Sequence, residues 1–188
     1  MSNTPRSRPA LLRMSSAGLW LAALLMSGAT AAIAFPLMKQ LGPTLPGFTA
    51  YPGEHHRIAA GMVMARVFVA CDVLQIVAAV LVLVAGLWSS RRPAPTGLVT
   101  RLGWVAIGLA IVLLVGKLAM LDPLMRAELG AFWSAAAAGS LIDAQLHRER
   151  FDALHPRASM VMYATAALVL GAIVAWLVGS ESRRSAER

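Results

Sequence analysis

The amino-acid sequence predicts an all-α integral membrane protein: a four-helix bundle with an extra amphipathic helix between spans 3 and 4. The first supporting observation is composition, because 58% of the 188 residues are hydrophobic, only 14% are charged, and the mean hydropathy is +0.67. A soluble domain of this size is more polar. The second is that four apolar segments each reach the ~20 residues that a membrane-spanning helix needs. The third is that basic residues flank these segments, as they do in membrane proteins.

The strong positive charge fits the same fold class. A net charge of +8 and a pI near 11.2 would suggest a nucleic-acid partner for a soluble protein. Here the flanking basic residues are expected to orient the chain and bind anionic lipid headgroups, and we exclude nucleic acid as a partner. The only cysteine, Cys71, lies within the second apolar segment, which excludes an intrachain disulfide and a thiolate metal cluster.

The chain divides into a basic tail, a transmembrane domain and a polar tail. We expect a disordered tail over residues 1–16, a four-span domain over 17–179 and a polar tail over 180–188. The spans are expected at about 17–38, 58–88, 101–121 and 158–178. Asp122-Pro123 is expected to end the third span, because the residue before proline disfavours the helical conformation.

The first apolar segment admits two interpretations. Its basic start, apolar run and Ala32-Ile33-Ala34 are also typical of a cleavable signal peptide. However, the apolar run from Ala17 to Ala34 is longer than most signal-peptide cores. We therefore favour a retained helix, although cleavage would leave three spans and place the new N-terminus outside.

The connection between spans 3 and 4 carries a helical pattern of its own. A stripe of residues at four-residue spacing keeps near one helix face, although it drifts slowly around the helix. It consists of Ala127, Ala131, Ala135, Gly139, Asp143, His147 and Phe151. This pattern predicts an extramembrane or interfacial helix from about Leu124 to Leu154.

A second four-residue stripe, made mostly of small residues, lies in span 4. It consists of Ser159, Tyr163, Ala167, Gly171, Ala175 and Gly179. Small side chains let helices approach closely. The face formed by Ala167, Gly171, Ala175 and Gly179 is therefore expected to contact a second copy of the chain or another membrane protein.

The distribution of lysine and arginine predicts the orientation of the four spans. Nine of these residues fall on the side that holds both termini, whereas six are spread over the longer connections on the opposite side, together with six acidic residues. The positive-inside rule therefore predicts a multi-pass protein of the cell (inner) membrane with both termini in the cytoplasm.

Most polar residues of the spans fall in the outer half of the predicted bundle. The residues of this polar cluster are Arg66, Asp72, Gln75, Lys117, Asp122, His155, Ser159 and Tyr163. A carboxylate at the depth of Asp72 costs a few kcal/mol unless it is paired, protonated or facing a wet cavity. We expect Asp72 to pair with Lys117 or Arg66, and Gln75 to share its helix face. A ligand or proton site and an incidental contact with lipid headgroups are the alternatives.

Four histidines on the outer side are weak candidates for metal binding. They are His55, His56, His147 and His155. Imidazoles on one face of a four-helix protein could bind copper, zinc or haem iron. None of them lies deep in a span opposite a partner, as an intramembrane haem would require, and no cofactor is predicted. The sequence contains no phosphate loop, zinc-protease motif, nucleophile elbow or nucleotide fingerprint.

Several short fragments resemble a known family. They are Phe35-Pro36 and Leu41-Gly42 after span 1, Arg66 and Phe68 at the start of span 2, Asp122-Pro123 after span 3, and Phe151, Leu154, His155 and Ser159 at the start of span 4. In this order they resemble the bacterial relatives of transmembrane protein 205, small four-span proteins of unknown function whose animal member is linked to platinum-drug resistance. The resemblance covers most of residues 17–179 and implies no established reaction.

The chain departs from this family at one position. Tyr163 stands one turn after Ser159, where the family tends to have asparagine, which puts in doubt the transfer of a polar site there. A weaker similarity, to copper-resistance membrane proteins, implies metal handling.

These observations predict a non-enzymatic membrane protein of unknown role with a polar site in its outer half. That site is expected to serve small-solute or ion handling, or assembly with a membrane partner. The alternatives are copper or haem handling through the outer histidines and, least favoured, an intramembrane enzyme.

Overall fold

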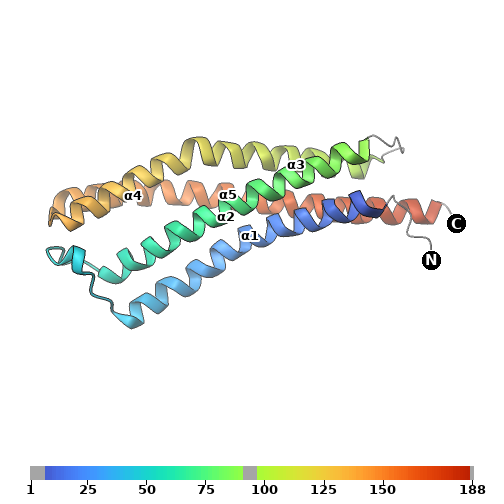
Figure 1. Cartoon of the computed structure of the whole chain (residues 1–188). Helices are drawn as coiled ribbons and strands as arrows, with labels where there is room; N and C mark the ends of the chain where they lie inside the picture. The colour runs from blue at the N-terminus through green and yellow to red at the C-terminus, as the bar shows by residue number, and fades with distance from the viewer. Residues whose placement is uncertain (1–6, 91–96, 187–188) are drawn as a thin grey trace. The chain divides into compact units, whose positions relative to one another are not determined.

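All regular secondary structure in the described residues is helical. The computed structural model describes residues 7–90 and 97–186 (Figure 1). The elements are α1 (Ser7–Leu41), the 3-10 turn η1 (Pro46–Phe48), α2 (His55–Ser90), α3 (Leu98–Gly116), the π-helical turn η2 (Lys117–Leu121), α4 (Asp122–Ala137) and α5 (Leu141–Ala186). The prediction of an all-α chain is confirmed for this part of the sequence.

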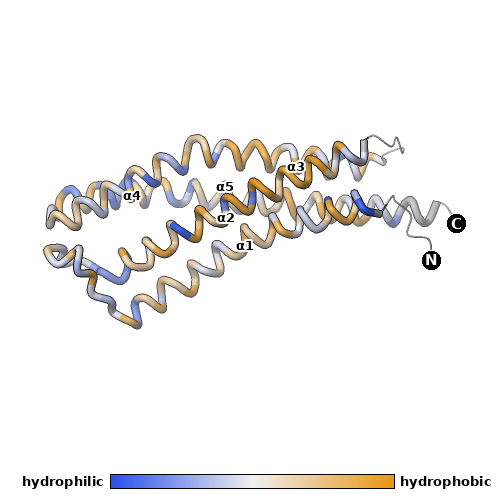
Figure 2. Tube along the Cα trace, in the orientation of Figure 1, coloured by the Kyte–Doolittle hydropathy of each residue, from blue (hydrophilic) through white to orange (hydrophobic). Residues whose placement is uncertain are grey.

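Four of the helical stretches are long and apolar enough to cross a membrane. They are Arg8–Leu41, His55–Ser89, Leu98–Ala137 and Leu141–Glu181. Figure 2 shows apolar residues along the helices, and polar residues gathered on α4 and the first part of α5.

The helices contribute to two compact units. Unit 1 comprises Met1–Leu25, Cys71–Leu113 and Ala164–Arg188, and unit 2 comprises Met26–Ala70 and Leu114–Tyr163. Unit 1 therefore contains the first part of α1, the second part of α2, most of α3 and the second part of α5. Unit 2 contains η1, η2, α4 and the remaining parts of these helices.

Unit 1 packs through tryptophans set against glycines. A Cβ atom at Gly86 would lie 2.5 Å from Cη2 of Trp104, and one at Gly103 would lie 2.5 Å from Nε1 of Trp176. Both distances are shorter than van der Waals contact, so only glycine lets each ring approach this closely. On α1, Trp20 has no exposed surface. The first part of α1 thus contributes to the core of unit 1, and the retention of this segment stays a prediction.

The core of unit 2 joins η1 to α2, α4 and α5. Its buried residues are Phe48, Ile58, Phe132, Ala136 and Ala144. Tyr51 packs its ring edge against Phe132, with 6.1 Å between ring centroids. The loop after α1 is therefore held against the α4–α5 hairpin by aromatic and aliphatic contacts.

The helices extend beyond the predicted spans at both ends of the chain. Residues 7–16 of the tail predicted to be disordered are helical, since α1 begins at Ser7, and α5 continues through the polar residues after Gly179 to Ala186. The segment Leu11-Leu12-Arg13-Met14 consists of good helix formers, and no proline or glycine follows Gly179 to stop α5. Residues 1–6 and 187–188 of the predicted tails, and residues 91–96 between spans 2 and 3, lie outside the described part.

The prediction that Asp122-Pro123 ends the third span was wrong. The helix continues through η2 into α4, and Asp122 keeps helical backbone angles of φ −63° and ψ −41°. A proline ring in an α-helix collides with the carbonyl four residues earlier. The wider π turn just before Pro123 relieves this collision, so the chain runs on without a break.

The helix predicted from about Leu124 to Leu154 is also interrupted. The chain turns at Gly139, which has φ +74°, a conformation that glycine adopts without strain. The N–H of Ser140 donates to the carbonyl of Ala135, and that of Gly139 donates to Ala136, which together form a Schellman motif. The prediction from the four-residue stripe missed this break because Gly139 fits a pattern of small residues.

A side-chain cap begins the next helix. The hydroxyl of Ser140 donates to Asp143 Oδ2 at 2.7 Å, three residues into α5. In consequence α4 continues the third span and α5 runs unbroken into the fourth. A separate amphipathic helix between spans 3 and 4 is not seen.

Substitution of Gly103 by alanine should destabilise unit 1. The added Cβ would collide with the buried Trp176 ring, and overpacking of this kind costs roughly 1–3 kcal/mol. We expect a lower midpoint of thermal unfolding for detergent-purified protein.

Gly108→Ala is the matched control on the same helix, because no atom lies within 4 Å of its added Cβ. This control should be neutral or slightly stabilising, since alanine is the better helix former. Equal midpoints for the two variants would contradict the tight contact.

Candidate functional site: polar groups buried within the helices

In unit 1, a directed chain of hydrogen bonds leads to the carboxylate of Asp72. The indole Nε1 of Trp20 donates to Gln75 Oε1 at 3.3 Å, and Gln75 Nε2 donates to Asp72 Oδ1 at 3.3 Å. All three side chains are buried: Trp20 has no exposed surface, Gln75 is 1% exposed and Asp72 is 5% exposed. The expectation that Asp72 and Gln75 share a helix face agrees with this contact.

The orientation of the Gln75 amide follows from its two neighbours. An indole nitrogen can only donate, and an ionised carboxylate can only accept. The amide oxygen must therefore face Trp20, and the amide nitrogen must face Asp72. This arrangement aims an N–H donor at the carboxylate of Asp72.

Sequence reasoning missed the role of Trp20. Its position in an apolar segment resembles that of any core aromatic residue, and its polar atom is a single N–H group. A usable signal was that a buried indole N–H normally requires an acceptor, and few polar side chains in the apolar segments can serve as one.

A second polar group in unit 1 lies over two indole rings. The Arg13 guanidinium carbon is 4.5 Å from the ring centroid of Trp176 and 5.8 Å from that of Trp104, within the range of cation–π attraction. The two rings are themselves 5.1 Å apart. Arg13 therefore connects the start of α1 to α3 and α5, a role that the predicted disordered tail did not anticipate.

In unit 2, a π turn brings Lys117 and Asp122 into a buried ion pair. Lys117 Nζ donates to Asp122 Oδ2 at 2.9 Å, and the two side chains are 6% and 10% exposed. In an α-helix, residues five positions apart point about 140° away from each other. The backbone N–H of Asp122 bonds the carbonyl of Lys117, and this i→i+5 closure turns the two side chains to the same face. Arg126 Nη2 lies 4.0 Å from the same carboxylate oxygen.

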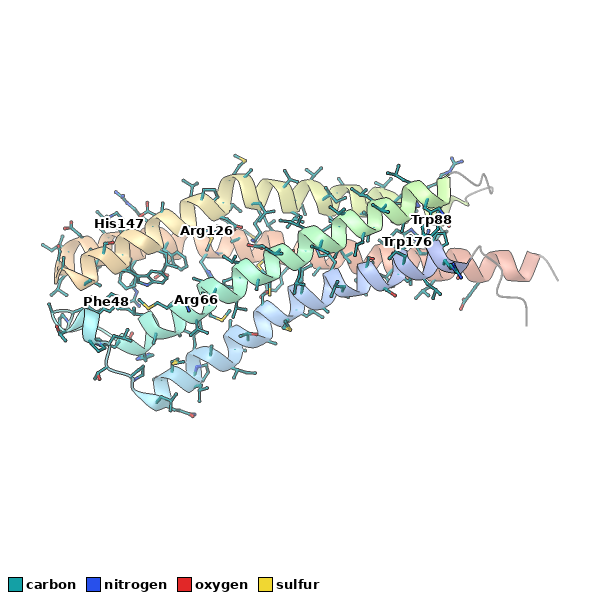
Figure 3. All side chains as sticks on the ribbon, in the orientation of Figure 1. Phe48, Arg66, Trp88, Arg126, His147 and Trp176 are labelled. Carbon is teal, nitrogen blue, oxygen red and sulfur yellow. The ribbon has the colours of Figure 1, made fainter. Side chains whose placement is uncertain are left out.

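The other predicted cluster members do not join this pair. Arg66 and His155 are exposed, Ser159 is half-buried and Tyr163 is 75% exposed. In the described residues Arg66 forms no ion pair or hydrogen bond, so its expected pairing with Asp72 is not seen. Figure 3 labels Arg66 on α2 and Arg126 on α4. The pairing of Asp72 with Lys117 stays a prediction.

The four candidate metal-binding histidines are engaged separately. His55 Nδ1 accepts the N–H of Leu45 at 3.0 Å, which leaves its Nε2 to donate to the Tyr51 carbonyl at 2.9 Å. His147 Nδ1 bonds Glu128 Oε2 at 2.7 Å. His56 lies 3.9 Å from Glu54, and His155 packs its ring near Phe151. Over residues 7–90 and 97–186, no group of three or more His, Cys, Asp or Glu side chains is placed to hold a metal ion.

Within unit 1, the predicted contact face of span 4 is open only in its first half. Ala167 and Gly171 are exposed, whereas Ala175 and Gly179 are half-buried, and a Cβ at Gly179 would lie 2.6 Å from Oγ1 of Thr100. The core of unit 1 uses a neighbouring face of α5. That face consists of Thr165, Val169, Ala172 and Trp176. A partner for the small-residue face stays a prediction.

Removal of Lys117 should strongly destabilise unit 2. Lys117→Met leaves the Asp122 carboxylate buried without its closest cation, a change that typically costs roughly 3–5 kcal/mol. We expect a large drop in the thermal midpoint of the purified protein, moderated by the nearby Arg126.

The double variant Lys117→Met/Asp122→Asn should recover most of that loss, because the carboxylate that Lys117 neutralises is removed together with it. Additive effects of the two single substitutions in this mutant cycle would contradict a direct pair.

Comparisons with known proteins add no further assignment. No family model matches the sequence, and no match is found among curated proteins or solved structures. The resemblance to relatives of transmembrane protein 205 stays a prediction, and the candidate site rests on the geometry of its own side chains.

Proposed function

We propose that this chain is a multi-pass protein of the cell (inner) membrane, with both termini in the cytoplasm, that handles a small ion or solute through its buried polar side chains. The observation that carries this proposal is the chain of hydrogen bonds from Trp20 through Gln75 to Asp72. Ionisable residues within membrane spans are costly and occur mainly where they serve ion or proton pathways.

The position of Asp72 supports a role beyond packing. It lies within the apolar stretch that runs from Val67 to Trp88, the length of one membrane crossing. A hydrophobic residue would pack there at far lower cost. The amide of Gln75 donates to the carboxylate and fixes its orientation, which a site for a proton or a small cation requires.

The position of Lys117 and Asp122 supports a second polar element. Their pair is built on a π turn, a feature that occurs frequently at functional sites and has an energetic cost in an otherwise regular helix. Both polar elements lie on helices that are long and apolar enough to cross a membrane.

The orientation can be tested with single cysteines, because Cys71 is the only native one and is buried. In a Cys71→Ala background, Thr44→Cys and Ser180→Cys place thiols at exposed positions in the loop after α1 and near the end of α5. In spheroplasts, a membrane-impermeant maleimide should label the first thiol, and should label the second only after permeabilisation.

The reverse pattern would overturn the orientation. Labelling of both thiols in intact spheroplasts would contradict the three spans proposed between them, since an odd number of spans places the two thiols on opposite sides. Release of the protein by alkaline carbonate would contradict membrane insertion itself.

Ion handling can be tested in reconstituted vesicles. Wild-type protein should raise proton, sodium or potassium flux above that of protein-free vesicles, measured with an entrapped pH dye and ion-selective dyes under an imposed membrane potential. Asp72→Asn should abolish this flux because it removes the charge while keeping the size of the side chain.

Asp152→Asn is the matched control, since Asp152 is an exposed carboxylate on α5. It should leave the flux unchanged. Wild-type flux equal to that of protein-free vesicles, or undiminished flux in Asp72→Asn, would refute the proposal.

A further inference from the structure

One exposed face of α2 is apolar along its length. The cationic side chain of Arg66 lies at its first end and the indole of Trp88 at its second end. The face is formed by Arg66, Val69, Val73, Val80, Val84 and Trp88. The valines and the tryptophan are each 45–53% exposed. At 100° per residue, these positions fall within a sector about 100° wide, so they form one continuous stripe.

The length of this stripe matches the thickness of a bilayer core. Arg66 and Trp88 are 22 positions apart on an unbroken helix. At 1.5 Å per residue this is about 33 Å, close to the ~30 Å of hydrocarbon in a typical membrane. Tryptophan is enriched at the level of the lipid headgroups. If Trp88 lies at one headgroup layer, Arg66 lies at the other; both are labelled in Figure 3.

Arg66 has no anionic partner in the described part of the chain. By contrast Arg57, an exposed arginine nine positions earlier on the same helix, pairs with Glu54. The charge of Arg66 stands on a face whose other members are apolar, and no described side chain balances it. A guanidinium group forms two parallel hydrogen bonds with a phosphate, the anion that every phospholipid carries.

We propose that Arg66 binds the phosphate group of a phospholipid and, together with Trp88, fixes the depth at which α2 crosses the membrane. The proposal rests on the membrane insertion proposed above, but not on ion handling. Under the proposed topology the bound lipid belongs to the outer leaflet. The acyl chains of that lipid would lie along the valine stripe, which offers them a smooth apolar surface.

Titration of the purified, delipidated protein with dioleoyl-phosphatidylglycerol tests this inference. Native mass spectrometry counts the lipids bound to wild type, Arg66→Gln, Arg66→Lys and the matched control Arg57→Gln. Arg66→Gln should weaken the tightest lipid site by about tenfold or more, the loss expected for one charge-assisted contact. Arg66→Lys should give an intermediate affinity because lysine keeps the charge but lacks the planar fork. Arg57→Gln should bind as wild type does.

Each other outcome overturns the proposal. Equal lipid affinity in wild type and both Arg66 variants would show that Arg66 makes no lipid contact. Equal losses in Arg66→Gln and Arg57→Gln would indicate a general effect of net charge. Displacement of the lipid by millimolar inorganic phosphate would assign the site to a free anion instead. If Arg66→Gln fails to fold, Arg66→Lys is compared with Arg57→Gln. Equal lipid affinities of these two variants would also show that Arg66 makes no lipid contact.

Failure of this inference can be separated from failure of the proposed function. The cysteine-labelling experiment reports on membrane insertion independently of Arg66. If the protein inserts correctly but its lipid affinity does not change when Arg66 is substituted, only the lipid contact is refuted.

Discussion

A charged side chain inside an apolar helix must meet a partner, and this constraint explains the least regular features of the structure. The neutral amide of Gln75 donates to Asp72, and Lys117 donates to Asp122. In the second case the partners are five positions apart, a spacing that an ordinary α-helix would not bring together. The π turn is the backbone change that lets the pair form, and it also accommodates Pro123.

The two buried acids represent different solutions to the same energetic problem. Asp122 meets a cation directly, so the pair is formally neutral and its cost of burial falls. Asp72 meets an amide whose orientation is fixed by an indole one helix away. The indole thereby holds the amide nitrogen against the carboxylate. Both elements place a carboxylate within a helical stretch that is long and apolar enough to cross a membrane, which is the basis of the proposed role in ion handling.

The sequence predicted the large features well, because they depend on composition and local pattern. The all-α class, the four long apolar helices, and the shared face of Asp72 and Gln75 all follow from residue type and the 3.6-residue period. The positions where helices end were harder to predict from the sequence. Asp122-Pro123 resembles a stop signal unless the preceding turn widens, and Gly139 fits a stripe of small residues until its positive φ is known. Contacts between distant segments, such as Trp20 with Gln75 or Arg13 with the two indoles, depend on packing that no local pattern encodes.

The tryptophan–glycine contacts of unit 1 have a consequence for how this sequence can change over time. The two residues of each contact must change together, because a larger residue at the glycine requires a smaller one in place of the tryptophan. The two contacts are Gly86 with Trp104 and Gly103 with Trp176. A lone change at either member leaves a collision or an empty space. Homologues that lose one of these tryptophans should therefore carry a bulkier residue at the facing glycine, and such linked replacements would reveal the same helix contacts from sequences alone.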